Sequence, residues 1–190
     1  MKFKLSRILI LLLLGVLLVG TLRLVKLFHR ETVAGPARLY YLKQLVLGFA
    51  DHYPGRSAIV VSKRDHLLYY CEDGKIVENE YWNGFVYNFP VKVSLASRWY
   101  RTPEGLVYID RKNERSRFTL FLGLSFPGDY GIHGAATRLA PFLNKMEYLD
   151  HNFAFVTRKD DTRGCVAVEN RVIKYLFAKV DYGTPVWILP

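Results

Sequence analysis

Cysteine is scarce in this chain, because its 190 residues include only Cys71 and Cys165. Two cysteines allow at most one disulfide, which excludes a disulfide-dense scaffold. Cysteine and histidine also lack the short spacings that are typical of structural zinc sites. A zinc site would have to combine His133, His151 and Cys165 from separate parts of the chain. We therefore expect neither a metal nor another cofactor.

Acidic residues are absent from the first 30 positions, which hold six of the basic residues. Setting these six aside lowers the formal net charge from +10 to +4 for the remainder. The remainder has no basic stripe interleaved with aromatic residues of the kind that binds single-stranded nucleic acid. We therefore expect no nucleic-acid partner.

An uncharged apolar run from Ile8 to Leu22 follows a basic start, as in a secretory signal or a signal anchor. No Ala-x-Ala cleavage site follows it, so residues 1–30 are interpreted as an uncleaved anchor, with Arg23 and Lys26 reaching the membrane interface. The folded part of the protein is then expected outside the cytoplasm. Basic residues on both flanks leave the orientation open.

The length and the 51% hydrophobic content suit one folded unit. Apolar residues spaced three and four apart predict a helix over Pro36–Tyr53, ended by Pro54-Gly55. This helix would form a membrane-proximal segment over residues 31–56, either as a stalk or docked on the domain. The chain shows no internal repeat and no low-complexity linker.

From Ser57 onward the sequence is typical of β-structure, with short runs rich in Val, Ile, Tyr and Phe. Asp73-Gly74 predicts a tight hairpin. A stripe from Val172 to Val180 predicts one helix, with Asn170 as a possible cap, before a last strand at Pro185–Leu189. We predict a mainly β domain over residues 57–190 with one or two helices. The other predicted strands are Ala58–Val61, Leu67–Cys71, Lys75–Tyr81, Tyr87–Leu95, Gly105–Ile109, Phe118–Phe126 and Phe153–Thr157.

Cys165 directly follows a glycine and leads into an apolar run. A free thiol with a pKa of about 8.5 is mostly protonated at neutral pH, so a nucleophilic cysteine needs a neighbouring base. Among the five histidines, His133 lies between Gly131 and Gly134, which allow close approach of backbone or substrate. His151 lies in a polar turn and is the alternative. We predict Cys165 and His133 as a catalytic pair.

Four segments in order resemble the L,D-transpeptidase family, whose domain is also called YkuD. They are Arg101–Ile109 (RTPEGLVYI), Gly131–Gly134 (GIHG), Thr162–Val168 (TRGCVAV) and Gly183–Val186 (GTPV). The resemblance covers about residues 57–190. It implies a β-sandwich or open barrel and activity on peptidoglycan stem peptides, which agrees with the exported location inferred from the N-terminal segment.

By this resemblance His133 would take the proton of Cys165, and the thiolate would form a thioester with a stem peptide. The N–H groups of Gly164 and Cys165 would stabilise the oxyanion, and the Gly134 carbonyl would orient the histidine. Thr162 would bond the histidine or the backbone near the thiol, or only form a turn. The acceptor would be an amine of a second stem peptide or of an envelope lipoprotein, and water would give hydrolysis. The expected location is the bacterial envelope, with an inner-membrane anchor and a periplasmic domain.

The sequence departs from the family pattern at Arg163 and in the length of the segment from Ala135 to Val156. Arg163 replaces the usual second histidine, and its charge would favour the thiolate or hold a substrate carboxylate. Asp161 is a candidate for binding the free amine of a diamino acid. The segment Ala135 to Val156 is longer than usual in the family, and it would form either a lid or a packed excursion.

Two other hypotheses remain open from the sequence. One is a hydrolase of the same fold, either a carboxypeptidase or an amidase of stem peptides. The other is a non-catalytic envelope-binding protein in which Cys71 and Cys165 form a disulfide.

Overall fold

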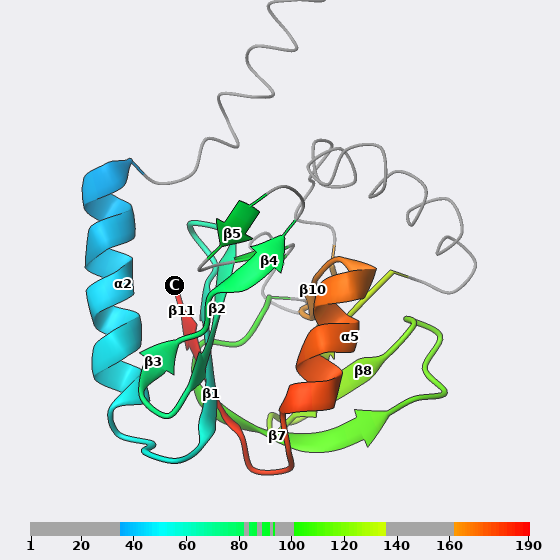
Figure 1. The fold of residues 1–190 in the computed structure, drawn as a ribbon. Helices are drawn as coiled ribbons and strands as arrows, with labels where there is room; N and C mark the ends of the chain where they lie inside the picture. Colours follow the sequence, from blue (N-terminus) through cyan, green and yellow to red (C-terminus); the bar gives the residue numbers. More distant parts are fainter. Residues whose placement is uncertain (1–34, 82–83, 87–88, 92, 94–100, 136–161) are drawn as a thin grey trace, which may run out of the picture. The chain divides into compact units, whose positions relative to one another are not determined.

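The computed structural model describes residues 35–81, 84–86, 89–91, 93, 101–135 and 162–190 (Figure 1). No helix in these ranges is long and apolar enough to span a bilayer. The predicted anchor over residues 1–30 lies outside the described residues. The described helices and strands are α2 (Pro36–Ala50), β1 (Ser57–Ser62), β2 (Leu67–Glu72), β3 (Lys75–Ile76), β4 (Asn79–Tyr81), β5 (Gly84–Val86), β6 (Phe89–Pro90), β7 (Gly105–Asn113), β8 (Phe121–Leu124), β9 (Gly131–His133), β10 (Val166–Ala167), α5 (Asn170–Lys179) and β11 (Pro185–Leu189).

A mixed sheet forms the centre of the domain, with the strand order β10-β9-β8-β7-β11-β1-β2-β3, while β6 also pairs with β2. The pairs β1–β11 and β9–β10 are parallel, and the other pairs are antiparallel. Strands β4 and β5 form a separate two-stranded sheet. Within the described ranges the fold is mainly β with two helices, which agrees with the predicted fold class.

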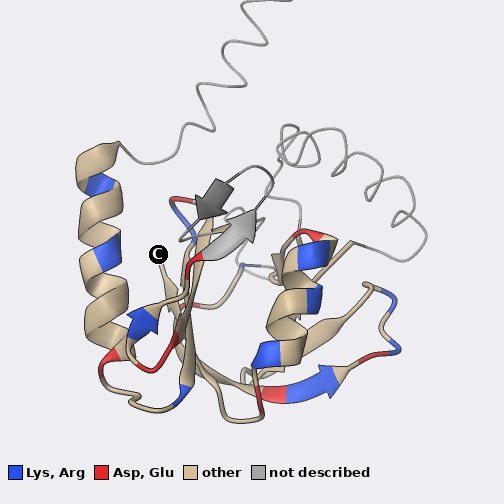
Figure 2. Cartoon of the chain, viewed as in Figure 1, with Lys and Arg blue, Asp and Glu red and all other residues tan. Residues whose placement is uncertain are grey.

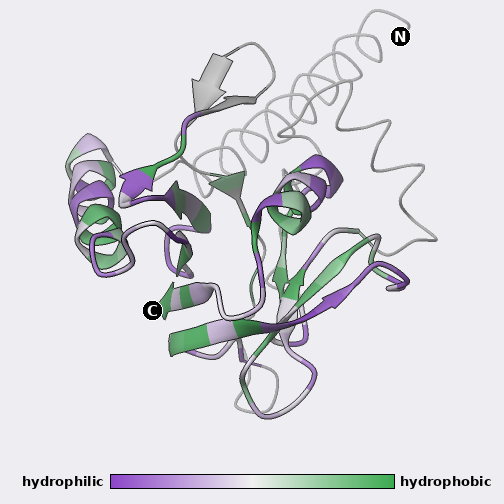
Figure 3. Ribbon diagram, turned by 60° about the horizontal axis from the view of Figure 1, so that its bottom comes forward, coloured by the Kyte–Doolittle hydropathy of each residue, from purple (hydrophilic) through white to green (hydrophobic). Residues whose placement is uncertain are grey.

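The two faces of the sheet are buried against different helices. In β1, Ile59 and Val61 belong to the core cluster that contains α5, whereas Ala58 and Val60 belong to the cluster that contains α2. This alternation follows from the two-residue period of a strand, and it explains why β1 is buried almost throughout. Both described helices carry hydrophobic and hydrophilic residues, and the long strand β7 changes from hydrophobic to hydrophilic along its length (Figure 3).

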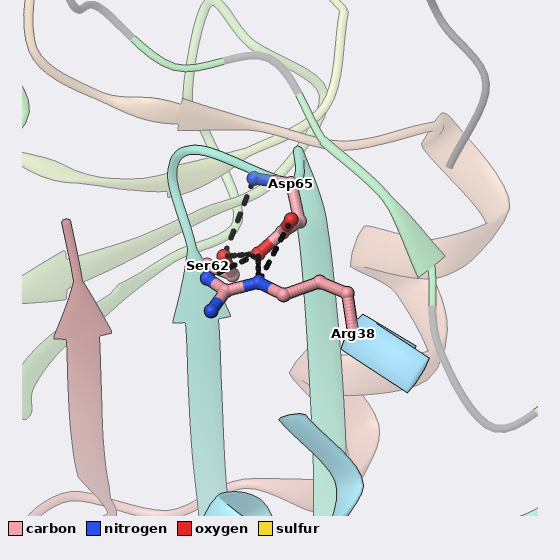
Figure 4. Close-up of polar contacts among 3 residues, drawn as sticks. All are labelled: Arg38, Ser62 and Asp65. Carbon is pink, nitrogen blue, oxygen red and sulfur yellow. Dashed lines mark hydrogen bonds and ion pairs between the residues drawn. The ribbon is translucent and has the colours of Figure 1, made fainter. Parts of the chain in front are cut away.

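Helix α2 is docked on the domain and is not a free stalk. Its residues Leu42, Val46 and Ala50 are buried against the sheet. A polar contact fastens its first turn, because Nε and Nη2 of Arg38 donate hydrogen bonds to the carboxylate of Asp65, which follows β1 (Figure 4). Ser62 Oγ also donates to Asp65. Burial acts to raise the pKa of Asp65, but the hydrogen bonds from Arg38 and Ser62 outweigh it and lower that pKa.

Most strand predictions are confirmed, with shifted boundaries. The final strand Pro185–Leu189 matches in full, and Asp73-Gly74 forms the tight turn between β2 and β3, with both residues at positive φ. The predicted strand Lys75–Tyr81 is divided into β3 and β4. The predicted strand Phe153–Thr157 lies outside the described residues.

The predicted capping role of Asn170 is wrong. Asn170 is the first residue of α5, and Glu169 occupies the cap position without a side-chain cap hydrogen bond. The Asn170 Oδ1 atom instead accepts hydrogen bonds from the Ala135 N–H and the Thr119 hydroxyl. This side chain therefore ties α5 to the segment that follows His133.

Lys63 is fully buried, which is unusual for a lysine. Its Nζ donates to the Thr102 carbonyl at 3.0 Å and to Glu104 Oε1 at 2.6 Å. Arg101 Nη2 donates to the same carboxylate oxygen at 2.7 Å. The buried ammonium thus fixes the turn between Arg101 and Glu104.

Replacing Lys63 by Met should lower the free energy of unfolding by about 2 kcal/mol, because the Thr102 carbonyl loses a charged donor while the side-chain volume is kept. The free energy is measured by urea unfolding of the full chain. The exposed neighbour Arg64, changed to Met, is the control and should shift it by less than about 0.5 kcal/mol. Equal effects of the two substitutions would contradict the structural role of Lys63.

Candidate active site around Cys165 and His133

Parallel pairing of β9 and β10 brings the predicted catalytic residues to adjacent strands. Val166 pairs with Ile132, and Ala167 pairs with His133. One step back in this register places Cys165 beside Gly131. Because side chains two residues apart share a face of the sheet, Cys165 and His133 lie on the same face. The parallel pairing of β9 and β10 therefore makes His133 and Cys165 neighbours, although they are far apart in the sequence.

His133 is held in one tautomer by the backbone. The side chain is buried, and its Nδ1 lies 2.6 Å from the Gly134 carbonyl oxygen. A carbonyl oxygen only accepts, so Nδ1 carries the hydrogen and Nε2 keeps its lone pair. The predicted orienting role of Gly134 agrees with this contact. Gly134 also has no room for a side chain, because a Cβ would lie 2.6 Å from Asn170 Oδ1.

Two phenylalanines enclose the imidazole ring. The Phe118 ring stacks on it with centroids 4.2 Å apart and an interplanar angle of 24°. The Phe121 ring is nearly parallel to it at 6.2 Å. Arg117 lies over Phe118 at 4.8 Å, and Arg111 lies over Phe121 at 5.9 Å. The catalytic candidate is thus embedded in an aromatic stack with a guanidinium at each end.

The pKa of His133 lies below its ordinary value, chiefly because burial disfavours the charged ring. The hydrogen bond to Gly134 opposes this effect, and the positive charge of Arg117 adds to it. The imidazole is therefore neutral at neutral pH. Its unprotonated Nε2 is the atom suited to act as a base.

Cys165 is partly buried, and its Sγ contacts the backbone that precedes β9. The thiol donates to the Asp129 carbonyl, with sulfur and oxygen 3.7 Å apart. The pKa of the thiol lies above its ordinary value because of burial, while the Gly131 N–H acts in the opposite direction. The charge of Asp129 raises this pKa and that of Arg117 lowers it. The resting site therefore holds a protonated thiol and a neutral imidazole, with the thiol bonded to Asp129 and not to the ring.

The turn before Cys165 depends on Gly164. Its φ of +93° is in the left-handed region that favours glycine. A Cβ there would lie 2.2 Å from Tyr130 Cε1 and 3.2 Å from the Arg101 carbonyl oxygen. Thr162 Oγ1 donates to the Cys165 carbonyl at 2.7 Å, so Thr162 bonds the backbone at the thiol and not the histidine.

The remaining predicted site residues are placed only in part. Arg163 is exposed in the turn before Cys165. Asp161 and the alternative base His151 lie outside the described residues, as does the predicted insertion from residue 136 onward. The described residues contain no group of three or more His, Cys, Asp or Glu suited to a metal ion.

The two cysteines are both free. Cys71 is buried in the cluster beneath α2, and burial raises the pKa of its thiol to about 12. The disulfide hypothesis is therefore wrong for this structure, and Cys71 packs in the core beneath α2.

Sequence reasoning missed Phe118, Phe121, Arg117 and Asp129. Phe118 and Phe121 fell within one predicted strand, where alternation would have put them on opposite faces. In the structure β8 begins at Phe121, and Thr119 has a positive φ of 63°. This irregular backbone lets both rings approach His133. No sequence pattern predicts the irregularity.

Comparisons with known proteins bear on the family and the fold. The sequence model of the YkuD family, described as the L,D-transpeptidase catalytic domain, matches residues 56–188. No curated protein sequence gives a significant match.

Solved structures of similar fold come from Mycobacterium tuberculosis. L,D-transpeptidase 3, in complex with a faropenem-derived adduct, is 12% identical over 70% of this chain and 60% of that chain, with a TM-score of 0.53. An L,D-transpeptidase from strain H37Rv is 16% identical over 70% of this chain and 57% of that chain, with a TM-score of 0.50. At these identities the likeness shows the fold alone, and this chain spans about 60% of the length of those structures.

The protonated resting thiol predicts a specific pH dependence of alkylation. The rate at which iodoacetamide modifies Cys165 should keep rising beyond pH 8.5, because the pKa of the thiol lies above that ordinary value. The rate is measured by mass spectrometry of the peptide that contains Cys165, and Cys71 in the same sample is the unreactive control. A plateau reached below pH 7 would instead indicate a preformed thiolate and imidazolium pair.

Proposed function

The chain belongs to the YkuD family of L,D-transpeptidase catalytic domains, and on this basis we propose that it catalyses cysteine-dependent acyl transfer on peptidoglycan stem peptides. The observation that carries the proposal is the common face of β9 and β10. There a free, partly accessible thiol directly before β10 shares a face with a neutral histidine on β9, whose Nδ1 is hydrogen-bonded to the Gly134 carbonyl. Cross-linking or remodelling of the cell wall is the resulting activity.

The first half-reaction forms a thioester. As Cys165 Sγ attacks the carbonyl carbon at the L-centre of the donor's diamino acid, His133 Nε2 takes the thiol proton. The tetrahedral intermediate then collapses, the C–N bond breaks, and the imidazolium gives its proton to the leaving amine of the terminal D-alanine. In the second half-reaction an acceptor amine attacks the thioester, which forms the new amide and returns the proton to the thiol.

Backbone groups supply the supporting interactions in this proposal. The N–H groups of Gly164 and Cys165 stabilise the developing oxyanion. The left-handed turn at Gly164 and the Thr162 bond to the Cys165 carbonyl support it, because both restrict this backbone. The Gly134 carbonyl keeps the imidazole oriented through both half-reactions.

The substrate-binding assignments stay proposals from the sequence. Arg163, exposed next to Gly164, supplies positive charge near the bound peptide. Asp161 binds the free amine of the diamino acid. The acceptor is a second stem peptide or an envelope lipoprotein.

We also propose that the protein acts in the bacterial envelope, anchored in the inner membrane with its domain in the periplasm. The absence of Asp and Glu from the first 30 residues and the apolar run Ile8 to Leu22 support this location, because they are typical of a signal anchor. Peptidoglycan stem peptides are accessible on that side of the membrane.

Transfer and hydrolysis differ in their products, and defined substrates separate them. Incubated with a disaccharide tetrapeptide, the full chain should produce a cross-linked dimer and D-alanine, and Cys165→Ala should produce neither. The products are identified by mass spectrometry. A disaccharide tripeptide without dimer would instead establish a same-fold carboxypeptidase, and an active Cys165→Ala variant would overturn the cysteine mechanism.

A further inference from the structure

The two arginines at the ends of the aromatic stack differ in their charge partners. Arg111 contacts the carboxylates of Asp110 at 3.3 Å and Asp129 at 3.4 Å. Arg117 is exposed, and no carboxylate within the described ranges forms an ion pair with it. The connection between β7 and β8, which carries Arg117, is shown with its basic residues in Figure 2. Among the described residues, the Arg111 end of the stack thus has carboxylate partners and the Arg117 end has none.

Arg117 is linked to the imidazole of His133 through one ring, because its guanidinium lies 4.8 Å from the Phe118 ring, which stacks on the imidazole at 4.2 Å. Its positive charge also lowers the pKa of Cys165 and that of His133. An anion bound at Arg117 therefore lies in the electrostatic neighbourhood of the reacting atoms.

The contact with Phe118 leaves the hydrogen-bonding edge of this guanidinium available. The guanidinium Cζ lies 4.8 Å from the ring centroid, and such a cation–π contact does not require its N–H groups to form conventional hydrogen bonds. Its N–H groups project in its plane, where they match the two oxygens of a carboxylate. The ring also restricts the side chain, which reduces the entropy that is lost when a carboxylate binds.

We propose that Arg117 binds the terminal carboxylate of the acyl donor and so selects donors that end one residue beyond the attacked carbonyl. This inference rests on the proposed function for the identity of the donor. In a tetrapeptide the carboxylate of the terminal D-alanine is separated from the attacked carbonyl carbon only by the amide nitrogen and one α-carbon. Arg117 is then a specificity-determining residue, and it releases its ligand together with the leaving group.

A pair of small reagents tests carboxylate binding without any peptide substrate. Iodoacetate and iodoacetamide both alkylate Cys165 with loss of iodide, but only iodoacetate carries a carboxylate. Both rate constants depend on the same thiolate fraction, so their ratio is independent of changes in thiol ionisation. In the full chain Arg117→Met should lower the iodoacetate-to-iodoacetamide ratio roughly fivefold, as expected for one exposed charge-assisted contact, and Arg117→Lys should lower it less.

Arg115→Met is the matched control, because Arg115 is an exposed arginine in the same connection, and its side chain forms no hydrogen bond or ion pair with a described residue. It should leave the ratio unchanged, and Cys165→Ala gives the background rate. An unchanged ratio in Arg117→Met, or an equal fall in Arg115→Met, would overturn the inference. A fall in Arg163→Met alone would also overturn it and assign the carboxylate to Arg163.

The donor itself gives the second test. The wild-type kcat/KM should be higher for a tetrapeptide with a free terminal carboxylate than for its amide, and Arg117→Met should remove most of this preference through KM. If the wild-type chain turns over neither peptide, the proposed function fails, while the alkylation ratio still decides whether Arg117 binds carboxylates. Turnover with the same preference in Arg117→Met would contradict the inference and leave the proposed function intact.

Discussion

The parallel pairing of β9 with β10 is the constraint on which the site depends. It sets Cys165 beside Gly131 and two positions from His133 on one face of the sheet. The neighbouring strand β8 fixes β9 in turn, since Phe121 pairs with His133. A shift of one residue in either register would turn one catalytic side chain to the opposite face. Gly164 and Thr162 stabilise the turn that precedes Cys165 and positions its thiol.

The electrostatics of the site favour a neutral resting pair. Burial lowers the pKa of His133 and raises that of Cys165, so the protein stabilises the uncharged form of both groups. In the proposed mechanism, proton transfer is then coupled to attack on the substrate, and the N–H groups of Gly164 and Cys165 stabilise the developing oxyanion. The rings of Phe118 and Phe121 pack against the buried imidazole and contribute to its desolvation.

Much of the fold, and the placement of His133 and Cys165 beside each other, could be predicted from the sequence, and the exceptions have physical causes. Strand periodicity and the Asp73-Gly74 turn are local signals, and they were sufficient to predict β1, β2 and the hairpin. The motifs around His133 and Cys165 are also local. The stack on His133 depends instead on positive φ at Thr119, and the ion pairs of Lys63 depend on contacts between distant segments. Asn170 has the composition of a helix cap, but tertiary hydrogen bonds to Thr119 and Ala135 replace that role.

The central claim is that Cys165 carries the acyl group of a stem peptide after His133 has accepted its proton. The most direct measurement is mass spectrometry of the Cys165 peptide after acid quench of the full chain with a disaccharide tetrapeptide. The account predicts a disaccharide-tripeptide acyl group on Cys165, which is lost in a folded His133→Asn variant. Product formation with Cys165 unmodified at every quench time, or acylation at the same rate in His133→Asn, would contradict it.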